Sequence, residues 1–385
     1  KIDKESFMCK EYPWMLGPFH KAAEANPCLV PKENTSFFCP VRQQNVAWES
    51  KDVFNPAAIV REDKVWLLYR AEDPVGKYAG TSRIGLAVSE DGLHFSTYPE
   101  PVLFPDADGF QSFEWEGGCE DPRIVETEDG KYFLYYTAFN GNVALLCCAE
   151  STDLIHWKKH GPIFQDTLSG KYAGLWSKSG AVVCRQCGEH FYPVRLQGTY
   201  WMYWGESNIY AATSEDLIHW TPVEFTADGS DPEHTYSPGR INYSPGKSNG
   251  NDSQNSVLLP VIIPRKGNYD EQLCEPGPQA ILTDAGIVLL YNGKGNNPEH
   301  LGGHDTMYQG GQLLLDPQNP ACAIARTQKP FISPSESFEL EGQVMPTCFL
   351  EGLVYFHGQY FLYYGTADSK VAIATFQPDK EKELV

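Results

Sequence analysis

Two carboxylates and a guanidinium lie close together in residues 115–124, where Glu120, Asp121 and Arg123 follow a Gly-Gly pair. Carboxyl groups can act as general acids or bases, and an arginine can hold a polar ligand. The same residues can also form a turn, because Gly-Gly frees the backbone, Asp-Pro often starts a turn, and Arg123 can neutralise its neighbours. Taken alone, this stretch favours neither interpretation.

Similar stretches recur along the chain, each as two strand-like runs joined by a turn or a longer excursion. The paired runs are 55–60 with 65–70, 120–125 with 131–136, 178–183 with 200–204, 275–282 with 286–291, and 346–350 with 359–364. Matching hairpin turns with an aromatic residue at their end follow at 89–95, 151–157 and 214–220. Five short antiparallel sheets at a spacing of roughly 65 to 90 residues predict an all-β fold, a five-bladed β-propeller. A β-sandwich is the alternative, although it does not predict this regular return of an aromatic-rich second strand.

The predicted repeats bring polar residues of different types to one place. In a propeller the strand nearest the axis starts or ends at the central channel, so equivalent positions of all repeats converge. The positions that open the first strands are Asn55, Asp121, Lys178 and Glu275, and those just after the second strands are Arg70, Glu206, Asn292 and Asp368. A structural repeat does not need these positions to be polar and different, so a binding site with one role for each repeat is the economical explanation.

Carboxylates that converge with cations and tryptophans are typical of a carbohydrate site. Trp115, Trp176 and Trp204 lie near the polar positions. Aromatic faces stack on sugar rings, and cleavage of a glycosidic bond needs one acid plus one base or nucleophile. For each tryptophan taken singly, packing in the core between repeats is the alternative.

The composition is that of an acidic protein with ample material for a core, since 385 residues include 42% hydrophobic and 13% aromatic side chains and carry a formal net charge of -20. This charge rules out a general nucleic-acid surface and disfavours an anionic membrane as partner. No apolar run approaches the roughly 18 residues that a membrane span needs. Residues 1–50 show neither helical nor strand periodicity, so we expect an irregular N-terminal arm packed on a propeller domain of residues 51–385. Such an arm would suit an interface, which leaves a homo-oligomer as an open expectation.

The cysteines do not form a disulfide framework, because their number, eleven, is odd and their spacing is irregular. A zinc site at Cys184, Cys187 and His190 lacks a second pair of ligands, so we expect no metal and no cofactor. The chain starts at Lys1, which leads us to expect a removed leader and export to the periplasm or medium; the cytoplasm is the alternative. The odd cysteine count argues mildly against an oxidising compartment.

Four motifs, in order along the chain, resemble those of glycoside hydrolase family 130. They are Asn55-Pro56-Ala57 with Tyr69-Arg70, then residues 82–87, 118–123 and 364–369. The resemblance extends from about residue 14 to residue 375 and implies a five-bladed propeller that acts on β-mannosides. Most known members of that family are inverting phosphorylases, and a minority are hydrolases.

The same resemblance implies roles for individual residues. Asp121 corresponds to the general acid, which protonates the leaving oxygen through a hydroxyl of the bound mannose. The residues expected to hold the mannose and its neighbour are Asn55, Arg70, Arg83, Arg123, Lys178 and Asp368, and Glu120 and Asn292 complete the candidates for substrate binding.

The sequence departs from the phosphorylase pattern where the attacking phosphate sits. Phosphorylases have an Arg after the strand of the third repeat and a His-Gly after that of the fourth, whereas this chain has Glu206 and Asn292. A phosphate dianion beside Glu206 and Glu275 would be repelled, since like charges at about 4 Å cost on the order of 4 kcal/mol at an effective dielectric constant near 20. A carboxylate at this place is what an inverting hydrolase needs as general base. The sequence therefore predicts an inverting β-mannoside hydrolase with Asp121 as acid and Glu206 or Glu275 as base.

We expect a β-1,2-linked manno-oligosaccharide as substrate, because the hydrolase branch of the family is associated with that linkage. The alternatives are a mannosyl phosphorylase that releases mannose 1-phosphate, a non-catalytic carbohydrate-binding propeller, and an arabinan or fructan hydrolase on a similar scaffold.

Overall fold

The protein is built almost entirely of β-strands. The computed structural model describes residues 11–226 and 256–378. Helices in these ranges are short: α2 (Gln111–Glu114), α3 (Ser337–Leu340) and the 3₁₀ turns η1 (Thr167–Gly170) and η3 (Leu301–Gly303). None of them is long and apolar enough to cross a membrane.

The first two groups of antiparallel strands follow the predicted pairs closely. The first contains β4 (Asp52–Arg61), β5 (Lys64–Glu72), β6 (Ser82–Ser89) and β7 (Ser96–Thr97). The second contains β8 (Gly118–Glu126), β9 (Tyr132–Phe139), β10 (Ala144–Ser151) and β11 (Lys158–Pro162). A single parallel contact between Ser82 of β6 and Gly118 of β8 joins the two groups into one curved sheet.

The third and fourth groups are less regular. The third contains β12 (Ala181–Cys187), β15 (Thr199–Trp204), β16 (Tyr210–Ser214) and β17 (Thr221–Pro222), and its long excursion forms β13 (His190–Pro193) and β14 (Arg195–Leu196). The fourth contains β20 (Leu273–Pro276), β21 (Ala280–Thr283), β22 (Gly286–Asn296), β23 (Thr306–Asp316) and β24 (Asn319–Arg326). A separate pair, β18 (Glu224–Thr226) with β19 (Ser256–Leu258), flanks them. The predicted run 275–282 is thus two strands, because Gly277 and Pro278 interrupt it.

The fifth group joins the two ends of the chain. It contains β25 (Cys348–Phe356), β26 (Gln359–Thr366) and β27 (Lys370–Phe376), and its outer strand is β1 (His20–Lys21) from the N-terminal arm. The arm is therefore not wholly irregular as predicted, since it also forms the hairpin of β2 (Phe37–Cys39) and β3 (Gln44–Val46). These strands are only two or three residues long, too short to give a recognisable alternation in the sequence.

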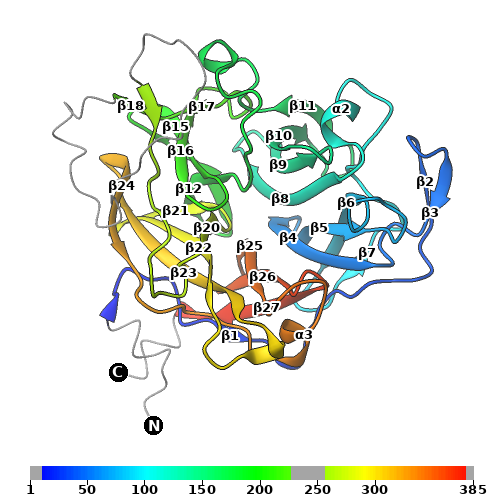
Figure 1. Ribbon diagram of the computed structural model, residues 1–385. Helices are drawn as coiled ribbons and strands as arrows, with labels where there is room; N and C mark the ends of the chain where they lie inside the picture. Colours follow the sequence, from blue (N-terminus) through cyan, green and yellow to red (C-terminus); the bar gives the residue numbers. More distant parts are fainter. Residues whose placement is uncertain (1–10, 227–255, 379–385) are drawn as a thin grey trace.

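Within each group, the first strand lies nearest a common centre and later strands lie further from it. Figure 1 shows β4, β8, β12, β20 and β25 nearest the middle of the view, with the later strands of each group further out. Four of these inner strands, β4, β8, β20 and β25, are almost completely buried, whereas β12 is buried only over its first four residues. Such strands position the start of each group at the centre, where the predicted polar residues lie.

The recurring turns are fixed by local hydrogen bonds. In the turn after β16, Asp216 accepts hydrogen bonds from the backbone of Ile218 and His219 and from the His219 ring, which holds its pKa at about 2 although burial opposes this. The same arrangement recurs at Asp91 and Asp153. The residues at 89–95, 151–157 and 214–220 thus serve the fold.

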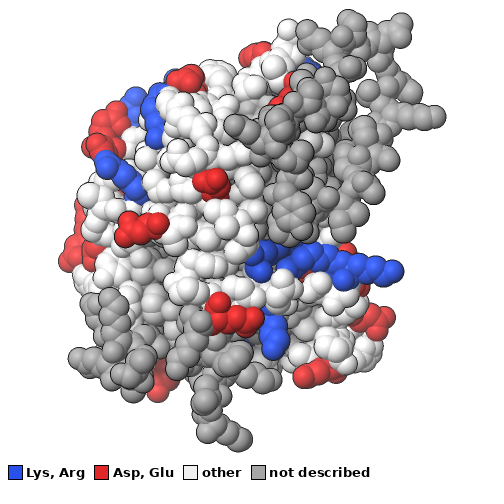
Figure 2. All heavy atoms as spheres, turned by 90° about the vertical axis from the view of Figure 1, so that its left-hand side faces the viewer, with Lys and Arg blue, Asp and Glu red and all other residues white. Residues whose placement is uncertain are grey.

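Charge is unevenly distributed on the surface. Figure 2 shows acidic side chains distributed over one face of the described chain, with the basic side chains gathered in a few places. This view agrees with the strongly negative net charge of -20.

Candidate active site

Asp121 lies at the centre of the candidate site, in a β-bulge of β8. The register with β9 shifts between Glu120 and Arg123, and Asp121 has a φ of 45°. Its carboxylate accepts hydrogen bonds from Asn55 Nδ2 and Arg70 Nη1, both at 3.0 Å, and lies 3.3 Å from Lys178 Nζ. Three groups of strands therefore meet at one carboxylate, as the sequence predicted for these residues.

The charges around Asp121 keep it anionic in the free protein. The residue is only 3% exposed, and burial alone would raise the pKa of its carboxyl group. The charges of Arg70, Lys178 and Arg123 outweigh burial and hold the pKa well below its usual range.

Arg70 connects Asp121 to two further carboxylates. Its Nη2 lies 2.8 Å from Glu72 Oε1 and 3.1 Å from Glu120 Oε1, and its Nε donates to Ser82 Oγ at 2.9 Å. Burial raises the pKa of Glu120, opposed by the charge of Arg70. Arg70 therefore balances several buried negative charges.

Glu275 and Glu206 form a second acidic cluster beside Lys178. Glu275 is 2% exposed and accepts a short hydrogen bond from Ser179 Oγ. Burial and the charge of Glu206 raise the pKa of Glu275 to about 7, against the opposing charge of Lys178. Glu206 is half-buried and accepts a 2.6 Å hydrogen bond from Trp176 Nε1. Lys178 thus interacts electrostatically with Asp121 and with both of these carboxylates.

Asp368 is a further carboxylate of the candidate site and lies in the turn between β26 and β27, where its φ is 51°. Burial, with the charges of Asp121 and Glu72, raises its pKa to about 7, while Arg70 opposes this. Asp368 therefore interacts electrostatically with Asp121, and its role in binding the substrate stays a prediction.

Three of the predicted binding residues use their polar groups within the protein. Arg123 lies 2.5 Å from Glu351 Oε1 and donates to the carbonyl oxygens of Pro276 and Gly277. Arg83 is fully buried and lies 2.7 Å from Asp73 Oδ2. Asn292 exchanges two hydrogen bonds with the backbone of Leu350. These three side chains therefore connect segments of the protein to one another.

Sequence reasoning missed Ser179, Tyr308 and Glu351. Ser179 is fully buried with a φ of 59°, and its position beside Lys178 was the only available signal. Tyr308 lies on β23, a strand outside the repeated pair, and burial followed by the charges of Glu275 and Glu206 raises its pKa. Glu351 is buried opposite Arg123 in β25, where an alternating strand pattern gives no hint of a charge pair.

The three tryptophans noted in the sequence have different environments. Trp204 is 1% exposed and belongs to the core. Trp115 is half-buried, with the guanidinium of Arg42 4.9 Å from its ring centroid. Trp176 is 45% exposed beside Glu206, so among the three it is the one with a free face next to the carboxylates.

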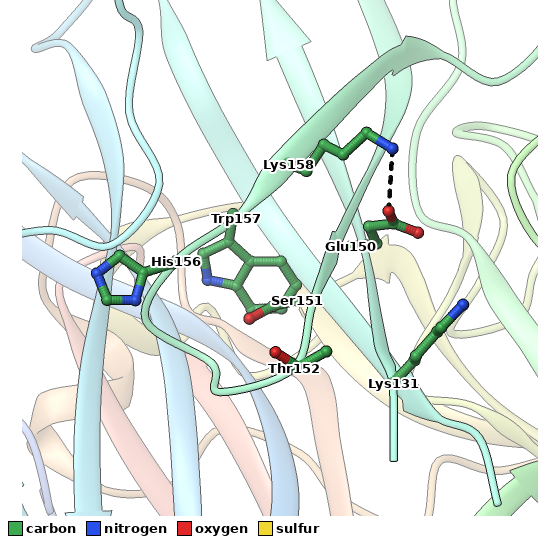
Figure 3. Close-up of a pocket in the computed structure, with 7 residues that line it drawn as sticks. All are labelled: Lys131, Glu150, Ser151, Thr152, His156, Trp157 and Lys158. Atoms are coloured by element: carbon green, nitrogen blue, oxygen red, sulfur yellow. Dashed lines mark hydrogen bonds and ion pairs between the residues drawn. The ribbon is translucent and has the colours of Figure 1, made fainter. Parts of the chain in front are cut away.

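Other features singled out in the chain are not part of the candidate site. A hollow of about 350 Å³ lies at the turn between β10 and β11 (Figure 3), where Lys158 Nζ lies 3.1 Å from Glu150 Oε1, and none of the predicted site residues line it. Cys184 is buried, and His190 bonds Glu126 at 2.6 Å. Among residues 11–226 and 256–378, no group of three or more His, Cys, Asp or Glu side chains is arranged to hold a metal ion.

Buried carboxylates interleaved with cations and a free aromatic face define a site suited to a polyhydroxylated, uncharged ligand. A family profile described as β-1,4-mannooligosaccharide phosphorylase matches residues 23–239 and 252–384. The chain belongs to glycoside hydrolase family 130.

Relatives of this chain include proteins named as phosphorylases and solved structures whose descriptions refer to glycoside hydrolases. A β-1,2-mannobiose phosphorylase of Thermoanaerobacter sp. (strain X514) is 29% identical over 367 residues, which cover 92% of this chain and 99% of that protein. A solved structure from work on family members that are glycoside hydrolases targeting β-1,2 mannosidic linkages in Candida mannan is 42% identical, with a TM-score of 0.84 and 95% of each chain covered. A glycosyl hydrolase from Bacteroides ovatus gives the same identity and TM-score over 95% of this chain and 96% of that one.

Proposed function

We propose that the protein is an inverting hydrolase of β-mannosides, with β-1,2-linked manno-oligosaccharides as substrates, built on a five-bladed β-propeller whose blades are the five groups of strands. The observation that carries the proposal is that two further carboxylates, Glu206 and Glu275, lie close enough to act electrostatically on Lys178, which itself lies 3.3 Å from Asp121. Two carboxylates there suit the activation of a water molecule and oppose a phosphate dianion. The 42% identity to the hydrolase-related structure, against 29% to the phosphorylase, supports the same choice.

In this mechanism Asp121 is the acid, and the base is Glu206 or Glu275. Because Asp121 is anionic in the free protein, it has to gain its proton in the complex. A bound sugar would exclude water and would accept hydrogen bonds from Arg70 and Lys178, which interact with Asp121 in the free protein. Both the loss of water and the weaker interaction with these cations raise the pKa of Asp121. A hydroxyl of the sugar then passes the proton to the leaving oxygen, so the carboxyl need not touch the glycosidic bond.

The test compares water with phosphate as the acceptor. Purified protein is incubated with β-1,2-mannobiose with and without phosphate, and the products are separated. We expect mannose at the same rate in both samples. Formation of mannose 1-phosphate only when phosphate is present would reject the hydrolase proposal. It would instead support a phosphorylase, the activity in the name of the Thermoanaerobacter relative.

A substitution tests the acid. Asp121→Asn keeps the size and hydrogen-bonding shape of the side chain but removes the ionisable group, so we expect cleavage to be lost while the thermal unfolding curve stays close to that of the wild type. Full activity in this variant would reject Asp121 as the acid.

A further inference from the structure

Three aromatic side chains form a row that begins at Trp176, beside Glu206. The ring centroids of Trp176 and Phe139 are 6.2 Å apart, and those of Phe139 and Tyr78 are 5.6 Å apart. Trp176 is exposed, while Phe139 and Tyr78 are half-buried. The three residues come from different groups of strands, so the row is a feature of the assembled fold.

The row meets the candidate site at Trp176, and the strands and loops that carry its other two members also carry site residues. Trp176 precedes Lys178 by two residues and donates its indole N–H to Glu206. Phe139 pairs with Gly118, at the end of β8 that leads into Asp121. Tyr78 lies on the loop between β5 and β6, whose flanking residues Glu72 and Ser82 both contact Arg70.

Exposed apolar surface gathers on the loops that carry this row. Among the described residues, six large hydrophobic side chains are exposed, and Val75, Leu168 and Trp176 lie on the β5–β6 and β11–β12 loops. Of these three side chains Trp176 is the one that contacts a site residue, so its exposed ring is available to a ligand. Aromatic rings with a polar rim suit the faces of pyranose sugars, which are apolar while their edges carry hydroxyls.

We propose that Trp176, Phe139 and Tyr78 form an extended subsite that binds sugar residues of the substrate beyond the two joined by the cleaved bond. The inference rests on the proposed function, and it identifies the substrate class as oligosaccharides longer than a disaccharide. Trp176 has two roles, because its ring contacts sugar while its N–H orients Glu206.

The experiment compares manno-oligosaccharides of two and of four residues, both with the linkage that the wild type cleaves fastest. Trp176→Ala and Tyr78→Ala are expected to lower the ratio of kcat/KM for the four-residue to the two-residue substrate by about tenfold each, in the range of a lost aromatic contact. Trp176→Phe keeps a ring but loses the N–H, so we expect it to preserve the ratio and lower kcat for both substrates. Phe38→Ala is the matched control, since Phe38 is an exposed aromatic on β2 outside the row; its ratio should equal that of the wild type.

An unchanged ratio in both Trp176→Ala and Tyr78→Ala would overturn the subsite. If the wild type cleaved neither oligosaccharide with water or phosphate, the proposed function would be rejected instead. Binding of the four-residue oligosaccharide by calorimetry needs no turnover, so weaker binding by Tyr78→Ala than by Phe38→Ala would still support the row. Equal binding by these two variants would reject it.

Discussion

Asn55 and Asp121 adopt the same left-handed backbone conformation in neighbouring groups of strands, and Asn55 donates a 3.0 Å hydrogen bond to Asp121. Their φ angles are 47° and 45°, each residue lies at a shift in strand register, and each precedes a proline. A non-glycine residue before proline normally avoids this region, so the conformation costs on the order of 1–3 kcal/mol. Strain of this kind persists where the surrounding structure enforces it, and here it aims two polar side chains at each other.

Substitutions of Asn55 separate backbone strain from side-chain chemistry. Asn55→Ala and Asn55→Gly both remove the hydrogen bond to Asp121, but glycine accepts a positive φ more readily. We expect Asn55→Gly to have the higher free energy of unfolding, by about 1 kcal/mol, whereas kcat/KM for a β-mannobiose falls to a similar extent in both. Denaturant unfolding and steady-state kinetics measure the two effects. If Asn55→Gly had wild-type activity, the amide would have no role beyond the backbone.

The buried pair of Arg123 and Glu351 is expected to stabilise the fold rather than to bind sugar. Arg123→Met leaves the Glu351 carboxyl unpaired and removes the anchors of Pro276 and Gly277, so the free energy of unfolding should fall by about 3–5 kcal/mol. Adding Glu351→Gln should recover part of this loss. Chemical denaturation of the single and double variants measures it.

The exposed pair of Arg195 and Glu215 is the control for that comparison. Arg195→Met should change stability little, because solvent screens an exposed ion pair. If Arg123→Met lowered the free energy of unfolding as little as Arg195→Met does, the structural role of Arg123 would be contradicted. Arg123 would then again be a candidate for substrate contact.

The sequence predicted the pairs of strands well because turns and aromatic-rich runs are local signals. It also predicted that Asn55, Arg70, Asp121 and Lys178 meet, because the repeat alignment places them at equivalent positions; the structure gives these contacts at 3.0–3.3 Å. Arg70 lies inside β5 rather than after it, since the strand continues to Glu72. Boundaries of this kind depend on tertiary pairing and are not visible in a single strand.

Partners within the site were harder to predict than its members. Asn292 and Arg123 are polar at the right positions, yet their hydrogen bonds go to Leu350, Pro276 and Gly277. The sequence gives residue type and position along a strand, while the direction of a side chain at a bulge depends on long-range register. Oligomeric state and export stay predictions.

The base can be identified by chemical rescue. Removing the base of an inverting hydrolase leaves room for a small anion, and azide needs no deprotonation to attack the anomeric carbon. We therefore expect azide to restore turnover of an activated β-mannoside in either Glu206→Ala or Glu275→Ala, with formation of the α-mannosyl azide. The product is characterised by NMR. A β-mannosyl azide would show a retaining mechanism, and rescue of neither variant would remove both residues as candidates.

The raised pKa values of Glu275 and Asp368 predict how stability depends on pH. Both carboxyls have a pKa of about 7 in the folded protein, from ordinary values of 4.5 and 3.8, so the folded state binds more protons than the unfolded state between these limits. Their contribution to stability is full below about pH 4 and is lost as the pH rises through about 7. Glu275→Gln keeps the hydrogen bond from Ser179 but cannot ionise, so the fall in unfolding free energy between pH 5 and 7 should become shallower, by an amount on the order of 3 kcal/mol at most. Urea unfolding at several pH values measures this slope, with Glu215→Gln, an exposed carboxyl, as control. An identical slope in Glu275→Gln and the wild type would show that Glu275 is ionised throughout this range.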